Sequence, residues 1–349
     1  MNPSGDASRR GADAAPRWDV AIVGAGPTGL ACAIELGRRG IPAVCYERGG
    51  ILESIQHFPE EMRFFSTRDL LGIAGVPFSS VDAHPSRLDA LAYYRGVAER
   101  FEVRVVAETT VERIDRVPDG FRLTASRSGR PGSHSIEAPE AVLATGFFHN
   151  PLRLDVPGSG LPHVHSRYVS GYPFHGRDVV VVGGKNSAAE AALDLYRHGA
   201  RVTLVHRGPA LSDKVKYWIR PDLENRIAAG RIRALFGAQI REISPESVRV
   251  ETPSGNETVR ADAVFALIGF EPDFALLERC GVRLDGPARI PVHDAETLES
   301  NVPGLFLAGA IPTGRETGRI FIENSRHHAG SIADAIAARR SIAEIARRK

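Results

Sequence analysis

The feature that most constrains the fold of this chain is a segment that occurs twice. Residues 19–49 and 178–208 align without a gap. Each copy has an apolar run rich in β-branched residues, a glycine-led turn, a stretch with helical apolar periodicity and a second apolar run. That order is typical of a β-α-β unit, whose parallel strands require a sheet buried under helices. The repeat therefore predicts an α/β protein with two Rossmann-like dinucleotide-binding domains.

The turn of the first copy carries the glycine fingerprint of a dinucleotide site. In such a loop Gly24 permits the tight turn, Gly26 lets the backbone approach a pyrophosphate, and Gly29 lets helix and strand pack closely. Glu47, at the end of the second apolar run, is placed to accept hydrogen bonds from a ribose. The residues predicted to bind this nucleotide are Gly24, Gly26, Pro27, Thr28, Gly29 and Glu47.

The second copy departs from this fingerprint in an informative way. His206, followed by Arg207, occupies the position that matches Glu47. A carboxylate repels a ribose 2′-phosphate, whereas an imidazole and a guanidinium attract it, so we predict that this copy binds NADPH rather than NADH. The alternative is that both side chains are only solvated. The predicted binding residues are Gly183, Gly184, Lys185, Asn186, Ser187, Ala188, His206 and Arg207.

Two dinucleotide sites in one chain suggest one fixed and one exchangeable cofactor, most simply a flavin that takes hydride from a nicotinamide. Turns after later apolar runs, at Thr145, Gly146 and Gly309, are predicted to complete the flavin site. A last helix is predicted within 320–340, with its N-terminus toward the flavin. Glu323 and Asn324 would then lie near the flavin ring or serve only as helix caps.

The order of these motifs predicts that one domain is inserted in the other. We expect residues 1–16 to be a disordered tail, since they are small, polar and poor in helix formers. Residues 17–150 and 287–349 are assigned to the FAD-binding domain, and residues 151–286 to the NADPH-binding domain.

Composition excludes several classes of function. A net charge of +2 gives no broad electrostatic case for binding nucleic acid. No apolar run approaches the length of a membrane span, so no membrane partner is expected. Three cysteines without a CxxC spacing argue against a disulfide-stapled secreted protein and favour the cytoplasm. No metal-ligand cluster is evident.

Motifs along most of the chain resemble the thioredoxin-reductase-like flavoproteins, and among them the bacillithiol-disulfide reductases of the YpdA type. The resemblance implies tightly held FAD, NADPH as donor, reduction of the disulfide of a low-molecular-weight thiol, and a homodimer or homotetramer. The motifs that carry it are GPTGL, FFSTRDLLGIAGVPF, LAYYRGVA, VVGGKNSAAEAALDL, FALIGFEPDF and IFIENSRHHAG.

The chain departs from this family at its proposed redox thiol. Residues 212–227, where thioredoxin reductases carry their CxxC pair, contain no cysteine. Thr28 replaces the single cysteine of the YpdA-type glycine loop, and a hydroxyl cannot form a mixed disulfide. Cys32, one helical turn further on, is the candidate substitute. The candidate catalytic residues are therefore Thr28, Cys32 and Glu323.

Three other functions remain open. The flavin could pass electrons to a small carrier such as ferredoxin or flavodoxin, or to a quinone. Residues 164–184 have some likeness to flavin monooxygenases, carried by His165, Ser166, Tyr168, Phe174 and Gly176. A flavin-holding redox sensor without turnover is the last alternative, against which the intact second loop counts.

Overall fold

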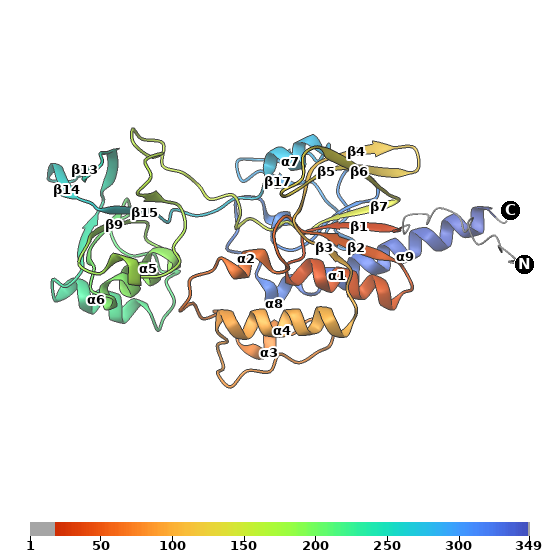
Figure 1. The fold of residues 1–349 in the computed structure, drawn as a ribbon, viewed down its shortest axis with the longest axis horizontal. Helices are drawn as coiled ribbons and strands as arrows, with labels where there is room; N and C mark the ends of the chain where they lie inside the picture. Colours follow the sequence, from red (N-terminus) through yellow and green to blue (C-terminus); the bar gives the residue numbers. More distant parts are fainter. Residues whose placement is uncertain (1–17, 348–349) are drawn as a thin grey trace, which may run out of the picture.

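Two lobes, each built on a five-stranded parallel sheet, make up the part of the chain that the computed structural model describes, residues 18–347 (Figure 1). The predicted tail, residues 1–16, lies outside the described residues. The first sheet has the order β18-β7-β1-β2-β3. The first part of this lobe comprises β1 (Val20–Val23), α1 (Pro27–Arg38), β2 (Ala43–Tyr46), α2 (Glu53–Gln56), α3 (Arg68–Leu71), α4 (Arg87–Arg100), β3 (Val105–Val106), β4 (Thr109–Val117), β5 (Gly120–Arg127), β6 (Ser133–Ala138) and β7 (Glu140–Leu143).

The second sheet repeats this arrangement strand for strand. Its order, β8-β15-β9-β10-β11, places β9 where β1 lies and β10 where β2 lies. The second lobe comprises β8 (Val164–His165), a 3-10 turn (Tyr172–Phe174), β9 (Asp178–Val182), α5 (Asn186–Arg197), β10 (Arg201–His206), α6 (Arg220–Ala228), β11 (Arg233–Phe236), β12 (Gln239–Ile243), β13 (Ser247–Thr252), β14 (Gly255–Arg260) and β15 (Ala263–Ala266).

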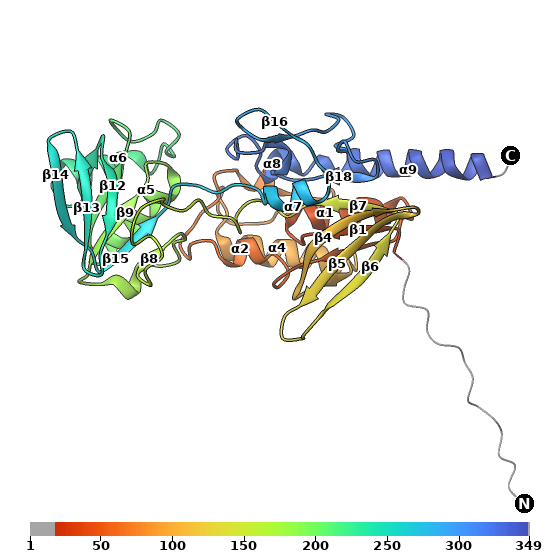
Figure 2. The same cartoon turned by 90° about the horizontal axis from the view of Figure 1, so that it is seen from above.

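The structural repeat is longer than the repeat in the sequence. In each lobe a three-stranded antiparallel sheet lies in the connection from an edge strand of the parallel sheet to a strand on the other side of its first β-α-β unit (Figure 2). The sheet β4-β5-β6 lies between β3 and β7, and the sheet β12-β13-β14 lies between β11 and β15. Alternation along the parallel strands sends side chains to two faces. In the first lobe Ile22 and Val142 pack under α1, α4 and α9, while Ala21 and Leu143 pack against β4 and β5. The predicted α/β class with two dinucleotide-binding domains is confirmed.

The chain crosses between the lobes twice, and the two crossings run side by side. Leu152 donates its N–H to the Gly269 carbonyl at 2.9 Å, and Glu271 donates to the Asn150 carbonyl at 3.1 Å. The rings of Phe148 and Phe270 stack with centroids 4.8 Å apart. The two connections are therefore joined to each other by hydrogen bonds and ring stacking, and they are not two independent linkers.

The return crossing lies earlier than the sequence suggested. The sequence predicts it near residue 287, yet Phe274 and Leu277 are buried in the first lobe, against β4 and β5. Apolar burial of this helix puts the return before Phe274. The chain then completes the first lobe with α7 (Phe274–Arg279), β16 (Leu284–Asp285), β17 (Ile290–Pro291), β18 (Leu305–Leu307), a 3-10 turn (Ile311–Thr313), α8 (Ile322–Ser325) and α9 (His328–Arg347).

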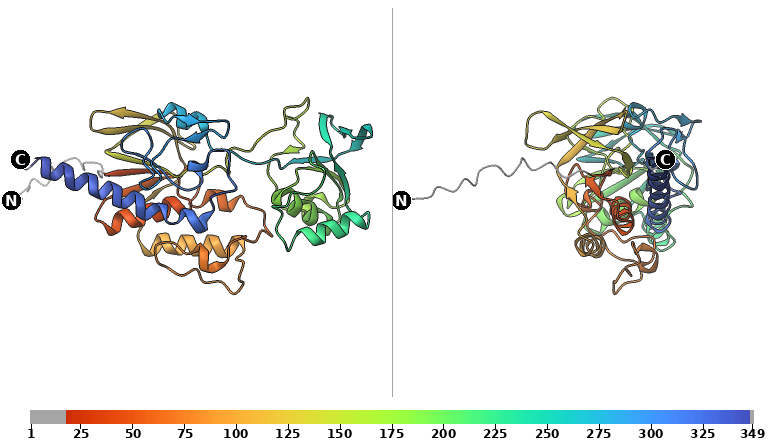
Figure 3. Two further views of the ribbon diagram at one scale, coloured as in Figure 1. Left: turned by 180° about the vertical axis from the view of Figure 1, so that it is seen from behind. Right: turned by 90° about the vertical axis from the view of Figure 1, so that its right-hand side faces the viewer.

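The predicted last helix is two helices in the structure. Asn324 accepts a hydrogen bond from the Phe321 N–H at 2.8 Å, which caps the short α8, and α9 begins separately at His328. Helix α9 packs alongside α1 on one face of the first sheet (Figure 3). Among the described residues, no helix combines the length and the apolar character that crossing a bilayer would require.

Candidate functional site

The first glycine loop joins β1 to α1 at the carboxyl end of the first sheet. Gly24 has φ +108°, and a Cβ there would lie 2.6 Å from the Ala144 carbonyl oxygen. A Cβ on Gly29 would lie 2.1 Å from the Gly24 carbonyl oxygen, so helix and strand approach too closely for any side chain. The space around Gly26 is open, and no side chain caps α1. Free N–H groups at a helix start beside open space fit a pyrophosphate.

Glu47 closes this loop from the end of β2. The side chain is buried, and its carboxylate accepts hydrogen bonds from the N–H groups of Ala25 at 2.8 Å and Gly49 at 3.3 Å. Burial raises the pKa of Glu47, and these backbone donors oppose the shift. Each carboxylate oxygen can accept a further hydrogen bond. Glu47 therefore braces the loop in addition to the ribose contact predicted for it.

The first turn of α1 meets the C-terminal segment of the chain. The Thr28 and Ser325 hydroxyls are hydrogen-bonded at 3.1 Å, although 297 residues separate them. Gly309, with φ +77°, lies directly beside Thr28, since a Cβ on Gly309 would be 3.5 Å from the Thr28 Oγ1. Ser325 is 3% exposed. In the sequence, Ser325 is marked only by its place in the IFIENSRHHAG motif.

His328 begins α9 at the same junction. Its Nδ1 accepts a hydrogen bond from the Gly309 N–H at 3.2 Å, which leaves the ring proton on Nε2. Burial, with smaller contributions from His293 and His327, lowers the pKa of His328 to about 4. The imidazole is therefore neutral at physiological pH and presents one N–H donor.

The remaining predicted residues of the first site have separate positions. Thr145 and Gly146 follow β7, and Gly146 has φ +63° with open space around its Cα. Glu323 is half-buried on α8. On α8 it is Ser325 that hydrogen-bonds to Thr28 of the glycine loop. A catalytic role for Glu323 stays a prediction.

Cys32 is not a substitute for the missing thiol. Its side chain is fully buried in the core between α1 and the sheet, and burial raises its pKa to about 12. Burial likewise raises the pKa of Cys45, and that of Cys280 to about 11. The thiolate is the nucleophilic form, so the proposed redox role of Cys32 is corrected to packing.

The second glycine loop makes the same turn between β9 and α5. Gly183 has φ +146°, and a Cβ there would lie 2.6 Å from the Leu267 carbonyl oxygen. Lys185 is the N-cap residue of α5, and no side chain caps this helix. Ala188 is fully buried and takes the place of the third glycine. Asn186 and Ser187 open the helix, so this turn also presents free N–H groups to a phosphate.

His206 and Arg207 lie at the end of β10, beside this loop. The His206 ring lies against Gly184, where a Cβ would be 2.4 Å from the imidazole. Partial burial, and then the charge of Arg207, lower the pKa of His206. Arg207 is exposed. Near pH 7 the permanent positive charge at this position is therefore that of Arg207.

The segment that suggested a monooxygenase has a structural role. Tyr168 donates its hydroxyl hydrogen to Asp194 on α5, and the Gly171 N–H donates to the same carboxylate at 3.0 Å. The rings of His165 and Phe174 pack against Phe265. These contacts anchor the segment before β9 on the second lobe. The other two residues of this likeness, Ser166 and Gly176, lie in the same segment.

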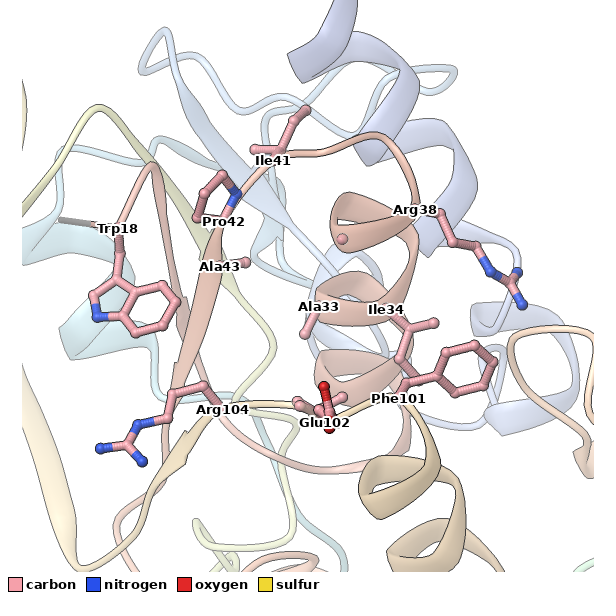
Figure 4. Close-up of a pocket in the computed structure, with 12 residues that line it drawn as sticks. Trp18, Ala33, Ile34, Arg38, Ile41, Pro42, Ala43, Phe101, Glu102 and Arg104 are labelled. Carbon is pink, nitrogen blue, oxygen red and sulfur yellow. The ribbon is translucent and has the colours of Figure 1, made fainter. Parts of the chain in front are cut away.

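A recess of about 410 Å³ lies at the other end of α1 from the glycine loop (Figure 4). Phe101 lies beside Ile34, and the Arg38 guanidinium lies over its ring at 5.0 Å. Ligands of parallel sheets bind beyond the carboxyl ends of the strands, whereas this recess is at the opposite edge. It is therefore separate from the nucleotide site.

Comparisons with known proteins agree on one group. The family model described as pyridine nucleotide-disulphide oxidoreductase matches residues 21–309. The chain is 39% identical over 322 residues to bacilliredoxin reductase Bdr of Bacillus subtilis, covering 91% of this chain and 97% of that protein. The structure of bacillithiol disulfide reductase Bdr (YpdA) from Bacillus cereus has a TM-score of 0.90 at 38% identity, covering 93% and 100% of the two chains. A ferredoxin–NADP reductase of Ignicoccus hospitalis is 27% identical over 302 residues, covering 84% and 90%.

Proposed function

The chain belongs to the pyridine nucleotide-disulphide oxidoreductase family, as its motifs predict. From that membership we propose that it uses NADPH and FAD to reduce the disulfide of a low-molecular-weight thiol such as bacillithiol. The observation that carries this proposal is the pair of glycine turns, each at the carboxyl end of a parallel sheet, which differ in the residues that end the second strand. The overall reaction consumes one disulfide, one NADPH and one proton, and yields two thiols and NADP⁺.

In this proposal the first lobe holds FAD. The α1 N-terminus would hold the pyrophosphate, Glu47 would accept a hydrogen bond from the ribose, and Thr28, Ser325 and His328 would hold the ring system. Bound FAD supplies a carrier that takes two electrons from NADPH and delivers them to the disulfide. Thr28 and Ser325 orient each other's hydroxyl groups, and His328 keeps a proton at Nε2.

The second lobe holds NADPH in the same proposal. The N-terminus of α5 would hold the pyrophosphate, and Arg207 would pair with the 2′-phosphate. A guanidinium suits this contact because it stays charged and presents several donors to phosphate oxygens. Burial and the charge of Arg207 lower the pKa of His206, and the negative charge of a 2′-phosphate would oppose this shift.

All three cysteines of the chain are buried, so we propose that the disulfide is reduced without a protein thiol. The same observation favours a second candidate: transfer of electrons to a small carrier protein. The 27% identity to a ferredoxin–NADP reductase supports considering this alternative.

The test is anaerobic oxidation of NADPH by the purified protein, with and without bacillithiol disulfide. Acceleration by the disulfide, with two thiols formed for each NADPH, supports the first candidate. Flavin reduction that stalls with the disulfide and resumes on addition of ferredoxin supports the second. A protein that binds FAD but oxidises no NADPH with either acceptor contradicts both.

A further inference from the structure

One segment of the second lobe touches both the second glycine loop and the first lobe. This segment, residues 211–219, is called the strap here. On the side of the glycine loop, the Ser212 N–H donates to the Gly184 carbonyl at 3.0 Å. The Asn186 amide donates to the Lys214 carbonyl at 3.0 Å and accepts from the Lys216 N–H at 2.8 Å. Three hydrogen bonds therefore fix the strap to the loop that is proposed to hold the NADPH pyrophosphate.

Lys216 extends this connection to the first lobe. The side chain is 6% exposed, and its ammonium group pairs with Glu190 on α5. The same Nζ donates to the Arg63 carbonyl oxygen of the first lobe at 3.1 Å. Acceptors stabilise a buried ammonium group, and separation of the lobes would break its contact with the Arg63 carbonyl.

Trp218 makes a second contact across the lobes. Its ring stacks on Phe65 with centroids 5.6 Å apart and planes at 17°, and it lies 4.7 Å from the His84 ring. Phe65 and His84 both belong to the segment of the first lobe between α2 and α4. The neighbouring Tyr217 is 74% exposed and touches only Trp218 among the aromatic rings of the described chain.

We propose that Lys216 and Trp218 are positioning residues, which hold the second glycine loop at a fixed place relative to the first lobe so that a nucleotide bound there is presented to the first site in one arrangement. The inference rests on the proposed function, since it takes the second loop to bind NADPH. The contacts run without a break from Asn186, through Lys216, to Arg63. Positioning of this kind changes the rate of electron transfer more than the affinity for the nucleotide.

The test uses the two tryptophans of the chain, Trp18 and Trp218. In a Trp18→Phe background, Trp218 alone reports on the contact between the lobes through its quenching by iodide. Lys216→Met removes the charge and keeps most of the side-chain volume, and Lys216→Arg is the conservative rescue. Tyr217→Ala is the matched control on the same strap. Affinity for NADP⁺ is measured by calorimetry, and flavin reduction at saturating NADPH by stopped flow.

Lys216→Met should make Trp218 more accessible to iodide and slow flavin reduction about tenfold, with the Kd for NADP⁺ changed less than about twofold. Lys216→Arg should recover most of the rate, and Tyr217→Ala should match the parent protein in the rate of flavin reduction and in the Kd for NADP⁺. If Lys216→Met does not fold, Trp218→Leu should show the same loss of rate at unchanged Kd. If Lys216→Met and the parent protein both bind NADP⁺ and show equal rates and equal quenching, this inference is overturned and the proposed function is not. A parent protein that binds no NADP⁺ overturns the proposed function, and this inference with it.

Discussion

The two glycine loops make the same turn, each against the residue that follows the equivalent neighbouring strand, β7 or β15. In each loop a Cβ on the leading glycine, Gly24 or Gly183, would lie 2.6 Å from a carbonyl oxygen just beyond the adjacent strand. The loops differ at the third fingerprint position, which is Gly29 in one and Ala188 in the other. The turn therefore follows from the spacing of strands in the sheet, whereas the distance between the helix and its strand can differ between the two loops.

The two loops differ less in their backbone than in the residues that pack around them. The first is braced by a carboxylate, Glu47, and is met by Ser325 and His328 from the far end of the chain. The second lies beneath the His206 ring and is fixed to the strap. If the proposed function holds, one turn serves two nucleotides because the surrounding elements, rather than the glycines, supply the charge and the contacts.

Gly29→Ala tests whether close packing is specific to the first loop, and the largest effect is expected here. The new Cβ would lie 2.1 Å from the Gly24 carbonyl oxygen, so α1 must shift away from β1. We expect loss of bound FAD and a fall of about 1–3 kcal/mol in the free energy of unfolding. The reciprocal Ala188→Gly should keep FAD and cost about 1 kcal/mol through helix propensity. The flavin-to-protein absorbance ratio and denaturant unfolding measure both; full FAD in Gly29→Ala would contradict the comparison.

Arg207→Ala tests whether charge distinguishes the two loops. Loss of a charged hydrogen bond to the 2′-phosphate should raise the Kd for NADP⁺ about 10- to 100-fold and leave the Kd for NAD⁺ unchanged. The KM for NADPH should rise in the same proportion relative to that for NADH. Arg48 occupies the matching position after Glu47 in the first loop, so Arg48→Ala is the control and should leave NADP⁺ binding unchanged. Equal losses for NADP⁺ and NAD⁺ would remove the 2′-phosphate assignment.

His328 predicts a dependence on pH that comes from the first loop. Its pKa is about 4 in the folded chain, below the usual value of 6.5, so the unfolded chain binds the proton more readily. The free energy of unfolding should therefore be independent of this group above pH 6.5 and fall as the pH drops toward 4. The expected loss at pH 5 is about 1–2 kcal/mol. Denaturant unfolding at pH 7.5 and 5 should show this loss, and His328→Asn should reduce it; an unchanged loss in that variant would refute the assignment.

Thr28→Cys restores a thiol to the first loop and has the smallest expected effect. A thiol in the first turn of α1 is favoured as the thiolate, which can attack a disulfide sulfur. We expect disulfide-dependent oxidation of NADPH to rise a few-fold, about 2- to 5-fold, if release of the product limits turnover. Thr28→Ser keeps the hydroxyl and should match the parent protein. A Thr28→Cys rate equal to that of Thr28→Ser would show that position 28 does not limit the reaction.

Local patterns in the sequence are sufficient to predict both β-α-β units, because apolar periodicity and the glycine turns are set by neighbours in the chain. The antiparallel sheets repeat in structure without a visible repeat in sequence, since many alternating patterns satisfy the same pairing. The return crossing was misplaced because the apolar residues of α7 would suit the core of either lobe. Helix periodicity could not tell whether Cys32 faces the cofactor or the core.

The contacts missed at the site are those between distant parts of the chain. Thr28 was recognised from the fingerprint, but its partner Ser325 could be identified only once the last segment was folded over the first sheet. Lys216 lies outside both glycine fingerprints. Its burial against Arg63 depends on how the two lobes meet, which no local pattern of residues records.

The paired crossings also bear on how such a chain can change during evolution. Asn150 and Glu271 are joined by a hydrogen bond of 3.1 Å, so the two ends of the second lobe lie side by side. A module whose ends meet can be exchanged or excised with little disturbance, since a short bridge closes the gap in its host. The first lobe can in this way keep its cofactor while the inserted module is replaced, and the choice of electron donor becomes separable from the choice of acceptor.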